Sequence, residues 1–342
     1  MQAVLKKCVI CKRESVEYWP SVEADFYSNC CSQKVNALEI PLPKSLSIGA
    51  VLVTYQPDAA ILDHVRRIAA QVSEFIVVDN ASDGPAAQWI ESMSKMPGVF
   101  LIRNRANLGI AAALNIGIRH ALQSHPEWIV TFDQDTAVPE NYFKRLLEAY
   151  GTCPHSRQVG MVVPGGLTEI GAPARPNPRR GRAWSFVPGA VNSGSLIKVE
   201  IFEKVGFYDE ALFIDYVDSD FCLRLLKNGF KILSATPVIF EHELGRRETR
   251  SFFGLTLTFR VHTAWRYYYK FRNRLLLYRR YWSVSFPWFL RDLWWLFLEL
   301  GRTFLLEHDR RPKVHATFQG LKDGLRGKSG RHPDFPPPQE PR

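Results

Sequence analysis

Two carboxylates one residue apart, Asp133 and Asp135, follow an apolar run from Trp128 to Phe132. If that run is a β-strand, alternate side chains point to the same face, so both acids would converge where the strand ends. Paired carboxylate oxygens are hard ligands that suit Mg²⁺ or Mn²⁺, and such an ion neutralises phosphate. A solvated turn is the other interpretation, because Asp is a common turn residue. This pattern alone leaves both interpretations open.

A second group of acids, Asp218 and Asp220, lies in the segment FIDYVDSDFCLR, where a helical pattern begins that ends at Gly229. Asp218 falls in or just before the first helical turn. A carboxylate there stabilises the helix dipole, which is one interpretation. The other is a general base that takes a proton from an incoming hydroxyl.

Alternating apolar strands and amphipathic helices must position these acids. Apolar runs of strand length occupy residues 48–55, 75–79, 99–102 and 128–133, and helical patterns follow them at 62–72, 86–93, 107–122 and 140–150. This alternation predicts an α/β domain whose mostly parallel sheet is covered by helices on both faces.

The carboxyl ends of parallel strands meet at one edge of a sheet, where ligands of open α/β sheets bind. The residues expected at this edge are Tyr55, Asp79, Asn104 and the Asp133/Asp135 pair. Asp79 could accept a hydrogen bond from a pyrimidine N–H, and Tyr55 could supply a flat apolar face. Capping of the next helix is an equally good interpretation for Asp79.

Other parts of the chain leave alternatives open. Cys8-x-x-Cys11 with the adjacent Cys30 and Cys31 resembles half of a zinc site, but adjacent cysteines are poor partners for one tetrahedral ion. A loosely held extension over residues 1–46 is therefore favoured.

The Gly-, Pro- and Arg-rich stretch 165–184 is either a functional lid or disordered. His242, at the end of the strand pattern 237–242, is either structural or a ligand of metal or diphosphate.

The net charge of +10 favours anionic partners such as nucleotide phosphates, phospholipid headgroups or nucleic acid. The basic residues crowd the last quarter among Trp, Tyr and Leu, which favours a membrane surface over nucleic acid. Within the apolar segment 287–306, four charged residues fall on one helical stripe: Arg291, Asp292, Glu299 and Arg302. A helix in the bilayer interface fits this pattern better than domain or dimer packing, or than a membrane span. Without a recognisable signal peptide, we expect a cytoplasmic protein on the inner leaflet.

Seven motifs occur in an order that resembles the inverting glycosyltransferases of family 2, which have the GT-A fold. They are TYQPD, VVDNAS, NRANLGIAAALNIGI, TFDQDT, VNSGSLI, FIDYVDSDFCLR and EHELG, over residues 47–330. Within that family the chain resembles the bacterial rhamnosyltransferases of O-antigen and cell-surface polysaccharide synthesis. The resemblance implies a donor such as dTDP-rhamnose, in preference to a UDP- or GDP-sugar, and a glycan or lipid-linked acceptor.

The resemblance also assigns residues. Asp218 would be the catalytic base, with Val217 standing where the family usually has Glu. A Mg²⁺ or Mn²⁺ ion would be held by Asp135, Asp133 and His242. The nucleotide would contact Thr54, Tyr55, Asp79, Asn104 and Asp133, and the sugar or acceptor would contact Asn192, Gly194 and Asp220.

The same likeness predicts the domain organisation. A GT-A domain would span residues 47–250, a basic and aromatic helical region would span 251–330, and a disordered tail would span 331–342.

Two other functions compete with that of a glycosyltransferase. A nucleotidyltransferase would need a Gly-rich basic phosphate loop after the first strand, which TYQPD does not offer. A nonenzymatic membrane scaffold would leave Asp133, Asp135 and Asp218 unexplained.

Overall fold

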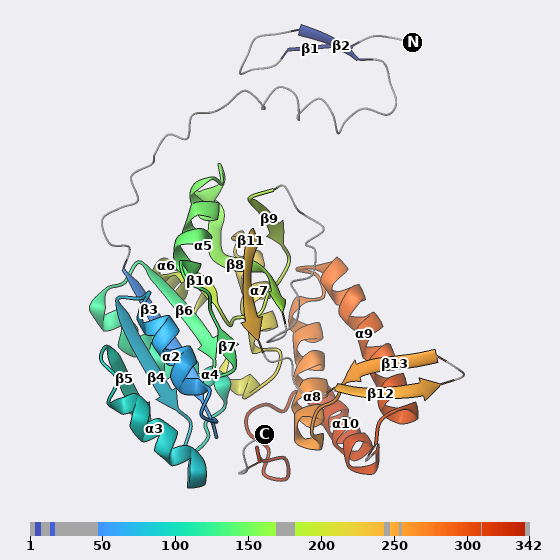
Figure 1. Cartoon of the computed structure of the whole chain (residues 1–342). Helices are drawn as coiled ribbons and strands as arrows, with labels where there is room; N and C mark the ends of the chain where they lie inside the picture. Colours follow the sequence, from blue (N-terminus) through green and yellow to red (C-terminus); the bar gives the residue numbers. More distant parts are fainter. Residues whose placement is uncertain are drawn as a thin grey trace. The chain divides into compact units, whose positions relative to one another are not determined.

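The computed structural model describes residues 4–7, 14–17, 47–168, 182–242, 247–252, 255–308 and 310–338 (Figure 1). The chain divides into two units, Met1–Ser45 and Leu46–Arg342. In the first unit, β1 (Val4–Lys7) pairs antiparallel with β2 (Glu14–Glu17). The four cysteines considered for zinc lie outside the described residues, as does most of the stretch 165–184.

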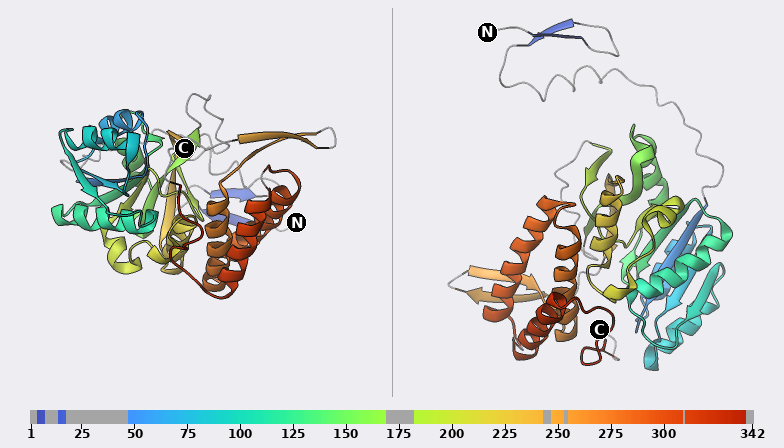
Figure 2. Two further views of the ribbon diagram at one scale, coloured as in Figure 1. Left: turned by 90° about the horizontal axis from the view of Figure 1, so that it is seen from below. Right: turned by 180° about the vertical axis from the view of Figure 1, so that it is seen from behind.

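The first half of the sheet in the larger unit is parallel, as the sequence predicts. Its strands are β3 (Ile48–Thr54), β4 (Glu74–Asp79), β5 (Val99–Arg103) and β6 (Trp128–Asp133), in the order β5-β4-β3-β6. Figures 1 and 2 show α2 (Ile61–Ala69) on one face and α4 (Ile110–Ala121) on the other. Because side chains alternate along β3, Ala50 and Leu52 join the core under α2, and Val51 joins the core under α4. Helix α3 (Ala87–Ser94) links β4 to β5.

The second half of the sheet is mixed, which is a departure from the mostly parallel sheet expected. Strand β10 (Ser195–Lys198) runs antiparallel to both β6 and β8 (Val159–Thr168), and β8 pairs parallel with β11 (Lys231–His242). Two short strands, β7 (Thr136–Ala137) and β9 (Trp184–Val187), pair antiparallel with β11. The helices here are α5 (Tyr142–Gly151), α6 (Val199–Val205) and α7 (Val217–Lys227).

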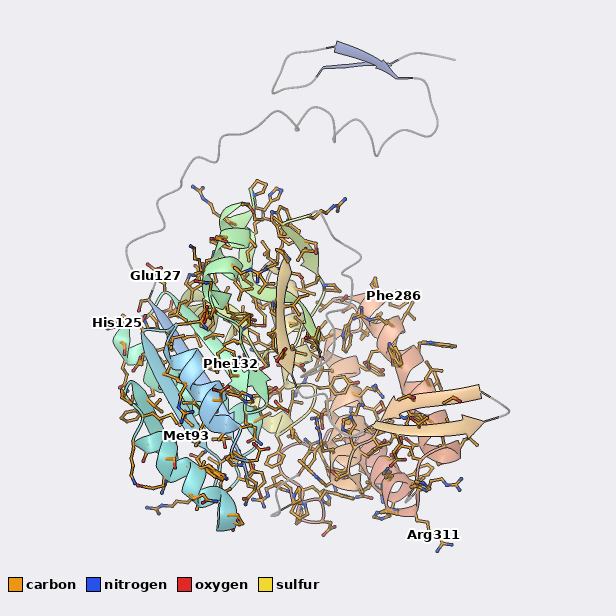
Figure 3. The ribbon with its side chains drawn as sticks, viewed as in Figure 1. Met93, His125, Glu127, Phe132, Phe286 and Arg311 are labelled. Carbon is orange, nitrogen blue, oxygen red and sulfur yellow. The ribbon has the colours of Figure 1, made fainter. Side chains whose placement is uncertain are left out.

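After the hairpin of β12 (Arg247–Phe252) and β13 (Leu255–Arg260), the chain forms α8 (Ala264–Tyr281), α9 (Phe286–Leu305) and α10 (Arg310–Leu325). Helix α8 is the buried member of this group, and its Arg272 and Arg274 are only 1% and 2% exposed. Figure 3 shows Phe132 in the middle of the sheet and Phe286 at the outer end of α9. Within the residues that the structure covers, no helix combines the length and apolar character that a membrane span requires.

The tail beyond Arg331, expected to be disordered, makes defined contacts as far as Pro338. Phe335 is buried and stacks on Tyr268, with ring centroids 4.5 Å apart. The backbone N–H of His332 donates to the Tyr269 hydroxyl at 2.9 Å. Aromatic burial against α8 therefore holds this part of the tail in place.

Candidate active site

Three of the predicted residues meet at one edge of the sheet because their strands are parallel and in register. Thr54 pairs with Asp79, and Val53 pairs with Asp133, so the ends of β3, β4 and β6 lie side by side. The N–H of Asn104 donates to the Asp79 carbonyl at 2.8 Å and brings Asn104 to the same edge. Thr54 is fully buried, so its side chain belongs to the interior side of this edge.

The two acids of the D-x-D motif do not lie on one continuous strand, as the sequence had suggested. Strand β6 ends at Asp133, and Asp135 lies in a turn that precedes β7. Side chains from other elements brace this turn. The Tyr55 N–H donates to the Gln134 side-chain oxygen at 2.8 Å, and the Asp133 N–H donates to the Ser193 hydroxyl at 3.1 Å. Gln134 and Ser193 thus position the motif, although no pattern in the sequence pointed specifically to either residue.

The backbone of His242 lies next to the D-x-D turn. It pairs with Thr136, the residue that follows Asp135, in the β11–β7 ladder. The imidazole itself lies outside what the structure describes, so its part in metal binding stays a prediction.

Asp79 closes a turn instead of capping α3. Its carboxylate, 3% exposed, accepts hydrogen bonds from the Ser82 hydroxyl at 2.5 Å and from the Ser82 N–H at 3.1 Å. Burial raises the pKa of Asp79 above its usual value, and the bonds from Ser82 oppose that rise. The carboxylate is therefore held in one orientation at the end of β4.

A network of side-chain amides beside Asp79 was not predicted, and its centre is Asn80. The Asn80 side-chain oxygen accepts from the Asn104 amide at 3.1 Å, and its amide donates to the Asn107 side-chain oxygen at 3.0 Å. The only signal for Asn80 in the sequence was its position directly after Asp79. The Tyr55 hydroxyl, also at this edge, donates to the Pro338 carbonyl of the C-terminal tail at 2.8 Å.

Asp218 is the second residue of α7, as the helical pattern predicts. Its carboxylate accepts from the Ser219 N–H at 2.8 Å. Burial raises the pKa of Asp218, the bond from Ser219 opposes this, and the negative charge of Asp215 raises the pKa further. A raised pKa makes the carboxylate a stronger base wherever it is ionised.

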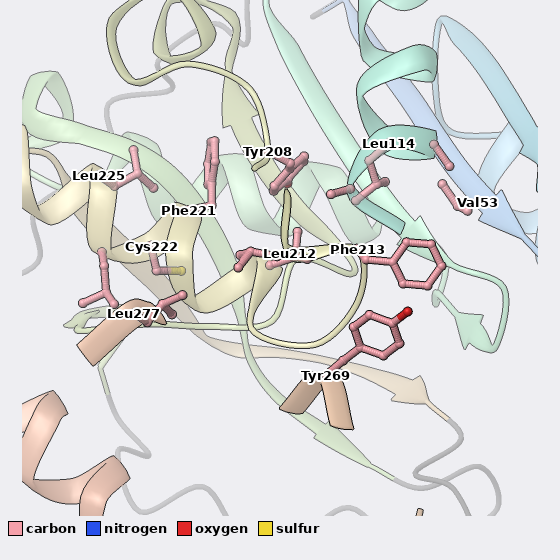
Figure 4. Packing of buried hydrophobic residues seen from close by; sticks show 14 of the residues in the cluster. Val53, Leu114, Tyr208, Leu212, Phe213, Phe221, Cys222, Leu225, Tyr269 and Leu277 are labelled. Atoms are coloured by element: carbon pink, nitrogen blue, oxygen red, sulfur yellow. The ribbon is translucent and has the colours of Figure 1, made fainter. Parts of the chain in front are cut away.

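The segment before α7 carries backbone strain. Phe213, Asp215 and Tyr216 have φ angles of +66°, +59° and +64°, which are unfavourable for residues with a Cβ. Such residues cost about 1–3 kcal/mol each and persist only where their surroundings enforce them. The Phe213 ring stacks on Tyr269 of α8, with centroids 5.0 Å apart (Figure 4).

A fully buried side chain, Asn273 of α8, enforces this conformation. Its amide nitrogen donates to three carbonyls of the strained segment at 2.8–2.9 Å, those of Leu212, Ile214 and Asp215. On the other side, the Ile110 N–H donates to the Phe213 carbonyl at 2.8 Å. A Cβ on Gly109 would lie 2.5 Å from that carbonyl oxygen, so this close approach requires glycine.

Arg266 of α8 connects the acids of β6 with those near α7. It forms an ion pair with Asp215 at 2.5 Å. Burial lowers the pKa of the guanidinium, but the charges of Asp215, Asp133 and Asp135 raise it, and the balance is a raised value. The sequence had grouped Arg266 with a basic membrane-facing region, whereas the structure places it among the site acids. Asp215 therefore pairs directly with Arg266, and the charges of Asp133 and Asp135 also act on this cation.

Two residues predicted to contact sugar or acceptor have packing contacts within the fold, and their contact with a ligand stays a prediction. Asp220 is fully buried, forms an ion pair with Arg224 at 2.8 Å and accepts from the Tyr281 hydroxyl at 2.8 Å, which ties α7 to α8. Gly194 has φ +75°, and a Cβ there would lie 2.5 Å from the hydroxyl oxygen of Tyr142.

Asn192 has a structural contact through its backbone. Its carbonyl accepts from the Thr131 hydroxyl of β6 at 3.0 Å, beside Ser193. The segment VNSGSLI thus braces the strand that ends in Asp133. A contact between the Asn192 side chain and the sugar stays a prediction.

The donor set can be tested against a divalent metal. Across the described ranges, no three His, Cys, Asp or Glu side chains form a group that could hold a metal ion. Asp133 and Asp135 still provide carboxylate oxygens. Mg²⁺ is often held by one or two carboxylates together with substrate phosphates, so these two residues fit that mode.

Comparison with known proteins gives consistent results. The model of glycosyl transferase family 2 matches residues 50–205. The dTDP-rhamnosyl transferase RfbF of Shigella flexneri is 30% identical over 295 residues, which cover 83% of this chain and 97% of RfbF. The low-salt glycan biosynthesis hexosyltransferase Agl10 of Haloferax volcanii is 24% identical, over 76% of this chain and 82% of Agl10.

A crystal structure of S. aureus TarS, residues 1–349, matches with a TM-score of 0.50 and 11% identity, over 82% of this chain and 81% of that one. A similarity at this level shows the fold alone. Together with the family match, it confirms the predicted GT-A-type α/β fold.

Proposed function

The chain belongs to glycosyltransferase family 2, and from this premise we propose that it transfers rhamnose from dTDP-rhamnose to a hydroxyl of a lipid-linked glycan, in cell-surface polysaccharide synthesis. The observation that carries the donor assignment is the 30% identity with RfbF over 97% of that protein's length. A UDP- or GDP-sugar donor is the competing assignment.

In the proposed reaction, Asp218 accepts the proton of the acceptor hydroxyl. The acceptor oxygen forms a bond to the anomeric carbon as the bond from that carbon to the diphosphate oxygen breaks, and the electron pair leaves with dTDP. One displacement inverts the anomeric carbon, so no enzyme nucleophile is needed. The raised pKa of Asp218 supports this role, because a stronger base accepts the proton more readily.

Charge develops on the departing diphosphate, and Arg266 supplies a fixed positive charge for it. This guanidinium is oriented by its ion pair with Asp215. A divalent ion held by Asp133 and Asp135, with His242 as a further ligand, would add electrostatic stabilisation of the same diphosphate.

At the other end of the donor, Asp79 would accept from the thymine N–H, with the Tyr55 ring against the base. The fixed orientation of the Asp79 carboxylate supports this assignment. Asn104 is fixed in the same way by its bond to Asn80. The donor end of the site is therefore preorganised, which reduces the entropy lost on binding.

Helix α9 supports an assignment to the membrane surface, because two of its four charged residues face inward. Asp292 and Glu299 bond to Arg274 of α8 at 2.9 and 3.2 Å, whereas Arg291 is exposed. The outward side of α9 is otherwise largely apolar, and we call these exposed residues the apolar face of α9: Phe286, Leu290, Trp294, Trp295, Phe297, Leu298, Phe304 and Leu305. An exposed patch of this kind marks an interaction surface. We assign it to the inner leaflet, where a lipid-linked acceptor would lie.

Liposome flotation tests the membrane assignment. Replacing Trp294 and Phe297 with Ser should move the protein from the floating to the soluble fraction, and the greatest loss is expected with anionic liposomes. A matched control, Phe100→Ser, changes an exposed aromatic residue of β5. Unchanged flotation of the α9 variant would remove the membrane assignment.

A thermal-shift panel of dTDP-rhamnose, dTDP-glucose, UDP-galactose and GDP-mannose, each with Mn²⁺ or Mg²⁺, tests the donor assignment. A ligand at one hundred times its Kd stabilises the folded state by about 2.7 kcal/mol. We expect dTDP-rhamnose to raise Tm most. A larger rise with the UDP- or GDP-sugar would replace the donor assignment and leave the family unaffected.

A further inference from the structure

A pocket of about 500 Å³ lies between the start of α7 and the helices α8 and α9. Asp218 lines it, so the pocket opens onto the residue assigned as the base. The other lining residues are Asp215, Tyr216, Ser219, Phe259, Lys270, Arg274, Asp292, Trp295, Leu298, Glu299 and Arg302. Most of these residues come from α8 and α9, which lie beyond the residues matched by the family model.

Each cation that lines the pocket is paired with a carboxylate. Lys270 bonds to Glu299 at 2.5 Å, and Arg274 bonds to Asp292 at 2.9 Å. Arg302 bonds to Glu299 at 3.4 Å. Counting the lining residues, four carboxylates face three cations, so the pocket offers no excess positive charge to a phosphate or other anion. Hydrogen-bonding groups without net positive charge suit an uncharged polar ligand.

Asp218 differs from the other acids of the pocket. Within the part of the chain that the structure describes, Asp218 forms no ion pair, and its carboxylate bonds to the Ser219 N–H. One of its oxygens can therefore accept a hydrogen bond from a bound hydroxyl.

The edge of the pocket is apolar. Trp295 and Leu298 line it while remaining 57% and 45% exposed, although a Trp side chain is usually covered in a folded protein. An exposed indole beside fixed polar groups provides a flat surface for the C–H face of a sugar ring. From this edge, the apolar face of α9 continues across the surface.

We propose that this pocket is the acceptor subsite. It holds a terminal uncharged sugar, with the attacking hydroxyl against Asp218 and the ring against Trp295, and the apolar anchor leaves along the apolar face of α9. This inference rests on the proposed function, which supplies the transfer reaction. It adds where the acceptor binds and that the terminal sugar of the acceptor is uncharged.

Saturation-transfer NMR on the full-length protein tests the subsite without a donor. The probes are octyl rhamnoside, octyl glucoside and the anionic octyl glucuronide, each below its micellar concentration. We expect the ring protons of the two uncharged glycosides to be saturated, with a signal at least five times that of the glucuronide. Because no sugar nucleotide is present, an incorrect donor assignment would leave this result unchanged.

Two tryptophans of nearly equal exposure provide a matched comparison. Trp295→Ala should reduce ring-proton saturation at least fivefold, and Trp295→Phe should retain more than half of it. Trp282, 56% exposed, lies outside the pocket, so Trp282→Ala should stay within twofold of the unmodified protein. Circular dichroism verifies the fold of each variant. The proposal would be overturned by equal losses in both Ala variants, by no saturation of the uncharged glycosides, or by equal saturation of the glucuronide.

Discussion

The parallel half of the sheet and the C-terminal helices both supply charged groups to the site, but they hold them by different means. At the ends of β4 and β6, Asp79 and Asp133 occupy positions fixed by strand register. In α8, Arg266 and Asn273 reach the site from a helix that also buries Arg272 and Arg274. The difference indicates that the proposed donor residues Asp79 and Asp133 depend on local sheet geometry, whereas Arg266 and the surroundings of the proposed base depend on long-range packing.

The largest effect should come from Asp218→Asn. Removal of the base should lower the transfer rate by roughly 10²–10⁴-fold, the usual contribution of general acid–base catalysis. Binding of dTDP, measured by calorimetry, should remain within threefold, because Asp218 is not among the residues proposed to contact the nucleotide. Turnover by Asp218→Asn close to that of the unmodified enzyme would exclude this residue as the base.

Asn273→Ala should show how far the strained segment depends on α8. Three backbone carbonyls would lose their shared donor, and a buried group left without a partner costs about 1–3 kcal/mol. We expect a lower Tm together with a reduced kcat, because the position of Asp218 changes. As a control, Asn228→Ala removes an exposed amide at the end of α7. A stable Asn273→Ala enzyme with unchanged kcat would show that the segment keeps its shape without α8.

Arg266→Gln tests a cation that joins the two regions. Loss of a charge-assisted contact to diphosphate should weaken dTDP binding by about tenfold, which corresponds to about 1.4 kcal/mol. The weakening should decrease at high salt, because screening already reduces the charge interaction. Calorimetry with Arg279→Gln, a change on the exposed side of α8, gives the comparison. Equal affinities in the two variants would remove Arg266 from the donor site.

The pH profile should show the smallest effect. Because burial and Asp215 raise the pKa of Asp218, kcat/KM should fall with decreasing pH at a value above the usual Asp pKa of about 3.9. Asp215→Asn removes a like charge, which lowers the pKa of Asp218. The acid limb of this variant should therefore move to lower pH. A shift in the opposite direction would contradict the assigned neighbours.

Much of the donor half could be predicted from the sequence. The apolar runs correctly predicted the strands, and their parallel register places Asp79, Asn104 and Asp133 at one edge of the sheet. The position of an acid within its motif did not show whether its side chain is buried. The sequence separated Asp218 from Asp220 only through the family resemblance, and it did not show that Asp218 lines a pocket while Asp220 is buried against Arg224.

The C-terminal contribution could not be predicted, because it depends on contacts between residues far apart in the chain. Arg266 lies 51 positions from Asp215, and Asn273 lies 61 positions from Leu212. The sequence showed a basic aromatic helix, and nothing local indicated which of its cations would turn inward. Only packing of α8 against the segment before α7 determines that orientation.

The most direct test of the account follows the stereochemistry of the slow donor hydrolysis, with water as acceptor. Proton NMR can identify the first anomer released from the sugar nucleotide that stabilises the protein most, before mutarotation mixes the two forms. A single displacement assisted by Asp218 predicts a first product with the anomeric configuration opposite to that of the donor. Release with the donor's own configuration would require two displacements and would contradict the assignment of Asp218 as the base.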